Sequence, residues 1–145
     1  MTFLPIVAGC QNDDPWADTS LHAFCLGDVQ IGFVLPRVLH AVRRYLDEHP
    51  TNLVRLDSSN GKLSLVLASN ATKSDRTEFM ADLAQWLRDT KQFADPLDGW
   101  RDEQYAIYGR RSEDQASEIV FTLERAACAL FGLTTFGVHL TVGSP

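Results

Sequence analysis

The sequence predicts an α+β fold: a single domain with a mostly antiparallel sheet that is covered by about three helices. Paired segments of alternating apolar and polar residues flank tight-turn signals, which is typical of β-hairpins. Two longer segments repeat apolar residues at helical spacing. The length of 145 residues suits one domain, residues 1–145, which can bury a sizeable core without disulfides.

The first elements are a loop and a hairpin. Residues 11–20 are polar and rich in turn formers, so we expect a loop with Trp16 packed onto the body of the domain. Residues 22–35 alternate on either side of Gly27 and Asp28, a pair that favours a tight turn. A hairpin is therefore predicted there.

A helix and a second hairpin come next. The helix begins at Pro36, whose fixed φ suits a first turn, and ends at His49-Pro50. Alternating residues within 54–67 predict two strands, with the turn at residues 60–61.

The second half begins with another helix. Asp75 and Glu78 resemble a capping box in acidic form and predict where that helix begins. We expect a loop over residues 93–99 and a short strand over residues 105–109.

The last elements are an extended piece, a helix and a strand. Residues 119–122 are predicted to be extended, residues 123–131 helical with Gly132 as the stop, and residues 136–142 a final strand.

Composition narrows the function classes. A net charge of −6 argues against a nucleic-acid or anionic-membrane partner, since either would require a basic face. Without a basic leader or a long apolar segment, a cytoplasmic location is expected. Cys10, Cys25 and Cys128 show no paired spacing, so they predict core residues rather than disulfides or a metal site. No cofactor motif is present, and none is expected.

The segment Trp100-Arg101-Asp102-Glu103-Gln104-Tyr105 concentrates the strongest candidates for chemistry. If it is extended from Arg101 to Tyr105, then Arg101, Glu103 and Tyr105 face the same side. Arg101 would hold an anionic or carbonyl oxygen, and Glu103 or Tyr105 would move a proton, beside the ring of Trp100. The alternative is an Arg–Glu pair that supports the sheet, with Trp100 in the core.

Other substrate-binding candidates are arginines and histidines. Arg76, Arg101 and Arg125 would bind a phosphate or carboxylate if they converged on one cleft; separate structural pairings are the alternative. His22 and His139 lie on predicted strands, where His22 would bind substrate and His139 would act as an acid or base. Either histidine is otherwise structural. The four histidines lack metal-ligand spacing.

Seven short segments along the chain suggest a lineage. They are Gly9-Cys10-Gln11-Asn12-Asp13, Ile31-Gly32-Phe33-Val34-Leu35-Pro36, Arg76-Thr77, Gly99 to Tyr105, Leu123-Glu124-Arg125-Ala126-Ala127, Leu130-Phe131-Gly132 and Phe136-Gly137-Val138-His139-Leu140. In their order and spacing the chain resembles the N-terminal domain of the thiamine-pyrophosphokinase-related Nudix hydrolases of fungi and plants.

In that family, the segment matching residues 137–140 leads into the catalytic domain. A Nudix box has a glycine and then a helix with Arg-Glu and Glu-Glu pairs, whose carboxylates hold magnesium ions. This sequence lacks such an array, so the resemblance implies the fold of the front domain and no Nudix hydrolase activity.

Two functions compete. The first is a stand-alone domain that binds a small organic metabolite, including a cofactor-independent acid–base enzyme of the isomerase, cyclase or lyase type. The alternative is a non-catalytic accessory module that binds a partner protein or forms a homodimer. Apolar residues near the C-terminus would form that surface: Phe131, Phe136, Val138 and Leu140. A truncated product that merely folds is a third interpretation.

Overall fold

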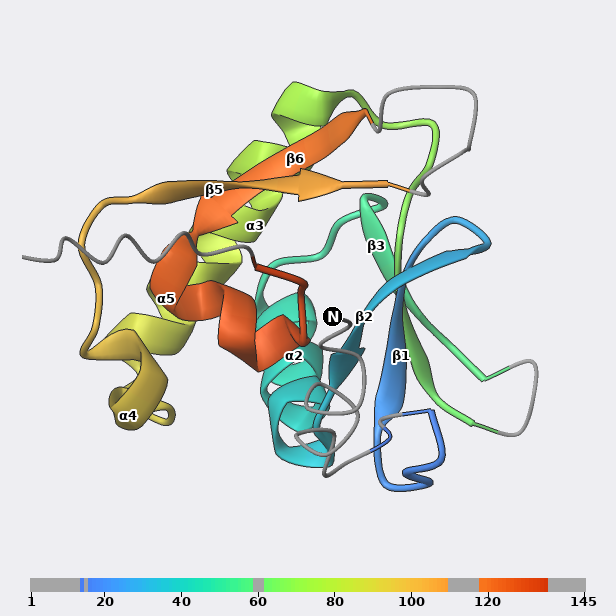
Figure 1. Ribbon diagram of the computed structural model, residues 1–145, viewed down its shortest axis with the longest axis horizontal. Coiled ribbons are helices and arrows are strands. Elements are labelled where there is room, and N and C mark those ends of the chain that lie inside the picture. Colours follow the sequence, from blue (N-terminus) through green and yellow to red (C-terminus); the bar gives the residue numbers. More distant parts are fainter. Residues whose placement is uncertain (1–13, 15, 59–61, 110–117, 136–145) are drawn as a thin grey trace, which may run out of the picture.

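A computed structural model describes residues 14, 16–58, 62–109 and 118–135 of the chain. The elements along it are β1 (His22–Leu26), β2 (Val29–Val34), α2 (Pro36–Glu48), β3 (Val54–Asp57), β4 (Ser64–Leu67), α3 (Lys73–Asp89), α4 (Ala94–Leu97), β5 (Gln104–Tyr108), β6 (Ile119–Glu124), α5 (Arg125–Cys128) and the 3-10 turn η1 (Ala129–Phe131). The predicted α+β class is confirmed. In Figure 1 the strands β1–β3 lie to the right, the helices to the left, and the β5–β6 pair across the top.

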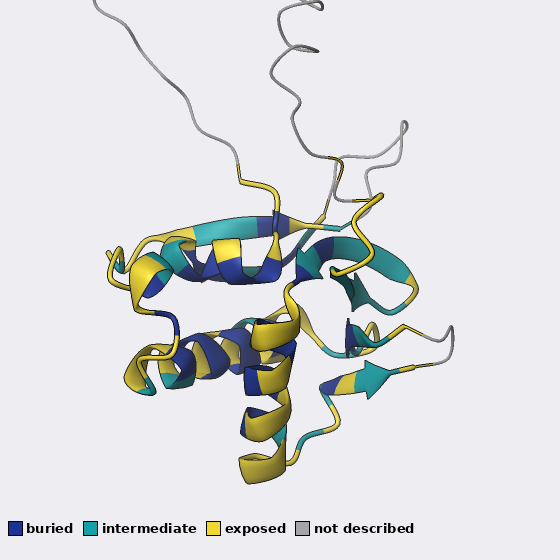
Figure 2. Cartoon of the chain, turned by 90° about the horizontal axis from the view of Figure 1, so that it is seen from below, coloured by how far each residue is buried: buried dark blue, intermediate teal, exposed yellow. Residues whose placement is uncertain are grey.

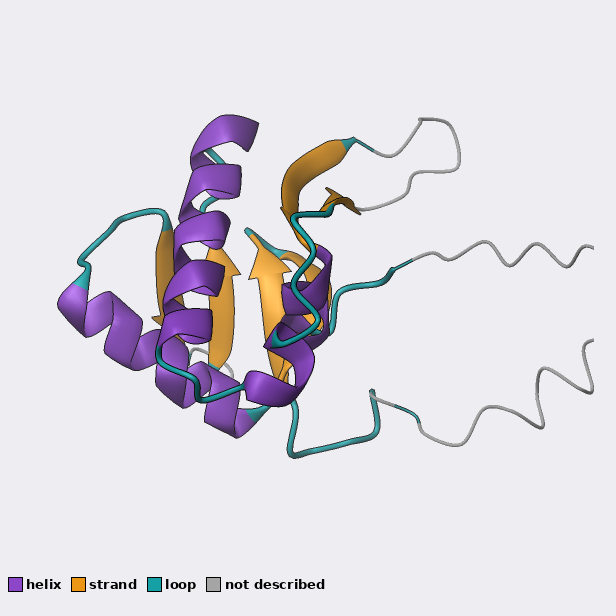
Figure 3. Ribbon diagram, turned by 90° about the vertical axis from the view of Figure 1, so that its left-hand side faces the viewer, coloured by secondary structure: helices purple, strands orange, loops and turns teal. Residues whose placement is uncertain are grey.

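The strands form two sheets rather than one. The larger has the order β2-β1-β4-β3, and the second contains only β5 and β6. The predicted hairpins β1–β2 and β3–β4 are both antiparallel, but the two central strands, β1 and β4, run parallel. The crossover through α2 makes that pairing possible, because parallel neighbours need a long connection. Figure 3 shows these strands beside the long helices.

Helix α3 begins earlier than the sequence pattern predicted. The capping box is formed by Thr72 and Asp75, whose side chain and main chain exchange hydrogen bonds, and not by Asp75 and Glu78. Helix α2 does begin at Pro36 as predicted.

Two other boundaries differ from expectation. The predicted loop over residues 93–99 contains the short helix α4. Strand β6 continues to Glu124, so the last helix begins at Arg125 instead of residue 123. Helix α5 ends at Cys128, and the 3-10 turn η1 continues to Phe131. The predicted stop is at Gly132, which has a left-handed φ of 53°.

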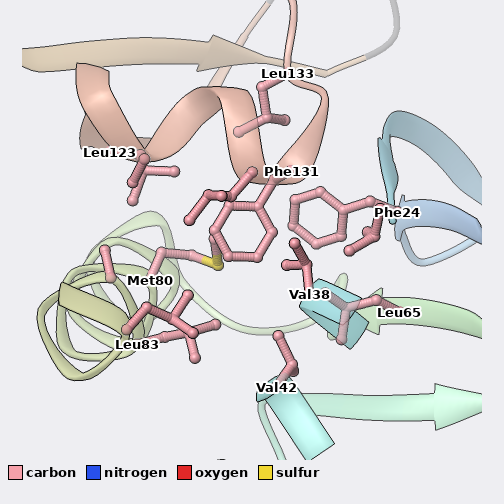
Figure 4. Close-up of a cluster of buried hydrophobic side chains, with 14 of the residues drawn as sticks. Phe24, Val38, Val42, Leu65, Met80, Leu83, Leu123, Phe131 and Leu133 are labelled. Carbon is pink, nitrogen blue, oxygen red and sulfur yellow. The ribbon is translucent and has the colours of Figure 1, made fainter. Parts of the chain in front are cut away.

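The core lies where the large sheet, the helices and β6 meet. Figure 4 shows side chains converging from each: Phe24 and Leu65 from the sheet, Met80 and Leu83 from α3, and Phe131 beside them. Figure 2 shows that each long helix has one buried and one exposed side. Burial of a stripe on each helix follows from the helical spacing of its apolar residues.

Two glycines let β2 and η1 approach closely. A Cβ atom on Gly32 would lie 2.3 Å from the carbonyl oxygen of Phe131, and one on Gly132 would lie 2.6 Å from that of Phe33. Both contacts are too short for any side chain. This contact joins two of the segments on which the family resemblance rests.

Some predictions concern residues outside the described ranges, namely the turn at 60–61, Cys10 and the strand over 136–142. Trp16 does contact the body, with its ring 4.9 Å from that of Phe33, but it is 70% exposed rather than tucked in. Cys128 is buried and Cys25 is half-buried. Within the described ranges, no helix has the length and apolar character needed to cross a bilayer.

Candidate functional site

The turn before β5 is built around Trp100. Its indole Nε1 donates to the Asp102 carboxylate at 2.8 Å, and the Arg88 guanidinium lies over its ring, 4.6 Å from the centroid. Asp102 has a left-handed φ of 58°, a conformation that Asp tolerates better than most residues. The expectation of an extended chain from Arg101 to Tyr105 is therefore wrong at Asp102.

This turn is fixed to the start of α5 by a buried carboxylate. Glu124 is only 2% exposed. Its two oxygens accept from the main-chain N–H groups of Arg101 at 3.3 Å, Glu103 at 2.9 Å and Ala126 at 3.3 Å. Three donors offset the cost of burying the charge, and Ala126 is also an otherwise unsatisfied donor at a helix start. We call Glu124 and these three donors the Glu124 brace.

A second pair of contacts joins the same two segments at the surface. The main-chain N–H of Arg125 donates to the carbonyl oxygen of Glu103 at 2.9 Å, and its guanidinium donates to the Glu103 carboxylate at 3.0 Å. The side chains are 54% and 47% exposed. The hydrogen bond to Glu103, and then its charge, raise the pKa of Arg125, which stays cationic at any ordinary pH.

A shallow depression of about 280 Å³ lies against the brace. It is lined by Pro96, Gly99, Arg101, Glu103, Glu124, Arg125, Ala126 and Ala129. Arg101 is exposed, and its guanidinium forms no hydrogen bond or ion pair with any other described residue. We call this hollow the Arg101–Arg125 depression. It combines two cations with one exposed carboxylate.

Three of the predicted site residues therefore meet: Arg101, Glu103 and Arg125. Trp100 and Tyr105 adjoin them in the chain, are half-buried and pack against the core rather than lining the depression.

Arg76, His22 and His139 do not join this group. Arg76 is 8% exposed, and its guanidinium donates to the main-chain oxygens of Val120 at 2.9 Å and Ala71 at 2.8 Å, with longer bonds to those of Ala68 and Ser69. Arg76 thereby connects the start of α3 to β6 and to the loop that precedes α3.

The histidines are likewise apart from the depression. His22 is half-buried on β1, with Nδ1 2.8 Å from the carbonyl oxygen of Leu63. His139 lies outside the described residues.

No role for Glu124 was predicted from the sequence. The pattern gave no signal for this role, because Glu124 falls inside the helix predicted over residues 123–131 and Glu is not among the residues that favour N-cap positions. Nearby, burial and then the charge of Glu124 raise the pKa of Cys128 to about 11, so that thiol stays protonated near neutrality. Among the described residues, no group of three or more His, Cys, Asp and Glu side chains is arranged to hold a metal ion.

Comparison with known proteins places these segments in a family. The family described as a domain of unknown function (DUF4743) matches residues 2–135. The chain belongs to this family. The match includes both segments of the Glu124 brace and both glycines of the β2–η1 contact. No curated protein matches the chain.

Proposed function

We propose that this DUF4743 domain binds a small organic molecule that carries a carboxylate or phosphate group, in the Arg101–Arg125 depression. One observation carries the proposal: Arg101 lines the depression, and its guanidinium has no partner among the described residues. Guanidinium groups bind planar anions through two parallel N–H donors, so an unused guanidinium on a concave surface favours such a ligand.

Arg125 supports the same ligand. Its pair with Glu103 is about half-exposed, and exposed ion pairs contribute little to stability because water and salt screen them. A ligand carboxylate or phosphate can therefore take the place of Glu103. Glu124 takes no part, since its oxygens are held by main-chain donors.

Acid–base catalysis is the enzymatic form of this proposal. Once a ligand anion occupies Arg125, the Glu103 carboxylate is free to accept a proton from the bound molecule, and Tyr105 lies two residues further along the chain. A cofactor-independent isomerase, cyclase or lyase would use these groups. Glu103→Gln would then abolish turnover without weakening binding, while Tyr105→Phe tests the phenol.

Isothermal titration calorimetry with inorganic phosphate and with succinate tests binding. We expect Arg101→Gln and Arg125→Gln each to weaken binding about tenfold, the scale of one charge-assisted hydrogen bond. Glu103→Gln should strengthen binding because it removes the competing carboxylate. Arg43→Gln, an exposed arginine on α2, is the matched control for net charge. Equal weakening by Arg43→Gln, or no heat with either anion, would refute the proposal.

A second candidate function is the accessory module, and a different region favours it. A depression of about 390 Å³ follows the edge strand β2 and includes the exposed Tyr108 of β5. An edge strand offers unpaired main-chain groups to another chain. The surface predicted from sequence needs one correction: Phe131 is fully buried in the core, and its other three residues lie outside the described ranges.

The resemblance to the N-terminal domain of Nudix hydrolases stays a prediction. Light scattering over a range of concentrations tests self-association. A dimer that Tyr108→Asp dissociates would support the accessory role, whereas a strict monomer at high concentration would count against a homodimer.

A further inference from the structure

A second concave surface lies between the end of α2, the loop that follows it and the first half of α3. This groove of about 360 Å³ is lined by, among others, Tyr45, His49, Asp75, Glu78, Phe79 and Asp82. We call it the acidic groove. Among the residues that line it, none is lysine or arginine.

Its carboxylates lie along one side of α3. Asp75, Glu78 and Asp82 follow each other at spacings of three and four residues, which places them on consecutive turns of the same helix face. Asp75 is occupied by the capping box. Glu78 and Asp82 form no hydrogen bond or ion pair within the described residues, and their like charges repel each other at this spacing.

Tyr45 brings a hydroxyl group without a hydrogen-bond partner in the described part of the chain to the lining of the groove. Tyr45 is only 6% exposed, and its ring is fixed by stacking on His49 at 4.4 Å and by edge contacts to Phe79 and Trp86. Its hydroxyl has no hydrogen-bond partner within the described residues. Among those residues, every fully buried side-chain nitrogen or oxygen atom has a partner. The hydroxyl oxygen is therefore not fully enclosed, and Tyr45 is one of the residues that line the groove.

Asp82 lines the same groove as Tyr45. Burial first, and then the nearby Asp82 carboxylate, raise the pKa of Tyr45, so the phenol stays neutral. Tyr45, Glu78 and Asp82 thus line one hollow, and their side-chain oxygens accept from no donor among the described residues. Such a set matches a donor-rich cation.

We propose that the acidic groove binds an alkylammonium group, with Glu78 and Asp82 supplying the charge and the Tyr45 hydroxyl accepting one of its N–H bonds. An ammonium offers three donors, which these three acceptors can satisfy. A metal ion fits less well, since the described residues hold no metal-binding cluster. The aliphatic stem would lie on the apolar part of the lining, Leu53 and Phe79.

Two sources could supply this chemistry: a free diamine or a lysine side chain of a protein. We would titrate the full chain separately with cadaverine and with Nα-acetyl-lysine N-methylamide, following amide signals by NMR. Signals at Tyr45, Glu78 and Asp82 should shift and saturate. Binding of cadaverine alone indicates a free diamine, and binding of both indicates that a lysine side chain fits. The Nε-acetylated lysine derivative, which lacks the charge, should not bind.

Variants separate this site from nonspecific attraction to a protein of net charge −6. The double variant Glu78→Gln, Asp82→Asn should weaken binding at least about tenfold, and Tyr45→Phe about threefold to tenfold. Asp47→Asn removes one charge from an exposed residue of α2 outside the groove and should change nothing. All three alter exposed or unpartnered groups, so thermal melts should match the wild type.

Three results would overturn the proposal. The first is that no signal shows a saturable shift below about 10 mM amine, the weak end of specific binding. The second is that Asp47→Asn weakens binding as much as the groove variants do, and the third is that calcium binds more tightly than either amine at the same signals. None of these touches the Arg101–Arg125 depression, so the proposed function stands or falls separately.

Discussion

Arg76 and Arg101 were candidates for one shared anion site, with separate structural pairings as the alternative, and their surroundings differ. Arg76 is buried, and main-chain oxygens of four residues accept from its guanidinium. Arg101 is exposed beside a depression, and its guanidinium has no partner among the described residues. The acids show the same division, since Glu124 is held by the main chain whereas Glu103 pairs at the surface with Arg125. Charges that the main chain satisfies stabilise the fold, and charges left open can bind a ligand.

The largest effect is expected at Glu124. Glu124→Ala leaves three partly buried main-chain N–H groups without an acceptor, so the free energy of unfolding should fall by about 3–5 kcal/mol. Glu124→Gln keeps one acceptor oxygen and should cost less. Urea denaturation measures both. A loss in the alanine variant no greater than that of a surface substitution would show that the brace is not structural.

The second-largest loss of stability is expected at Arg76. Arg76→Met preserves much of the side-chain volume but removes every donor to the oxygens of Val120 and Ala71, and should lower the free energy of unfolding by about 2–3 kcal/mol. Phosphate and succinate binding should be unchanged. A weaker phosphate affinity with intact stability would place Arg76 in the ligand site instead.

Cys128 tests how well this interior tolerates a charge that the main chain does not satisfy. Its thiol has a pKa raised from 9.0 to about 11, so the unfolded chain loses the proton first as the pH rises. The stabilising contribution is complete below pH 9.0 and is lost as the pH approaches 11. Relative to Cys128→Ala, the wild type should lose at most about 2 kcal/mol across that window. Urea denaturation at successive pH values measures this, and parallel pH profiles would contradict it.

The smallest effect on stability is expected at the exposed Glu103–Arg125 ion pair. Glu103→Gln and Arg125→Gln break an exposed pair, so neither should change the unfolding midpoint measurably. Their consequence should appear in ligand affinity, with opposite signs. A large loss of stability in either variant would show that this pair stabilises the fold instead of being available to a ligand.

Much of the fold was predictable because its signals are local. The hairpin about Gly27, the helix from Pro36 and the stop at Gly132 each rest on a residue with a specific backbone preference. The parallel pairing of β1 with β4 was not predictable, because it depends on how two hairpins pack together after the crossover through α2. Likewise, the capping box used Thr72 with Asp75, and nothing in the spacing excluded Asp75 with Glu78.

The candidate site was predicted in part for the same reason. Arg101, Glu103 and Arg125 were singled out by residue type, and they do meet. Their contact depends on the left-handed Asp102 and on the buried Glu124, and neither feature is visible as a periodic pattern. Arg76 was grouped with them because an arginine that binds main-chain oxygens has no distinguishing sequence signal.

The side-chain Nε–Hε signals of the arginines, observed by NMR during a phosphate titration, test the central claim most directly. We predict that the signals of Arg101 and Arg125 shift and saturate together, while the signal of Arg76 stays where it is. Shifts of equal size at all three, or at none, would contradict the division between charges that hold the fold and charges that bind a ligand.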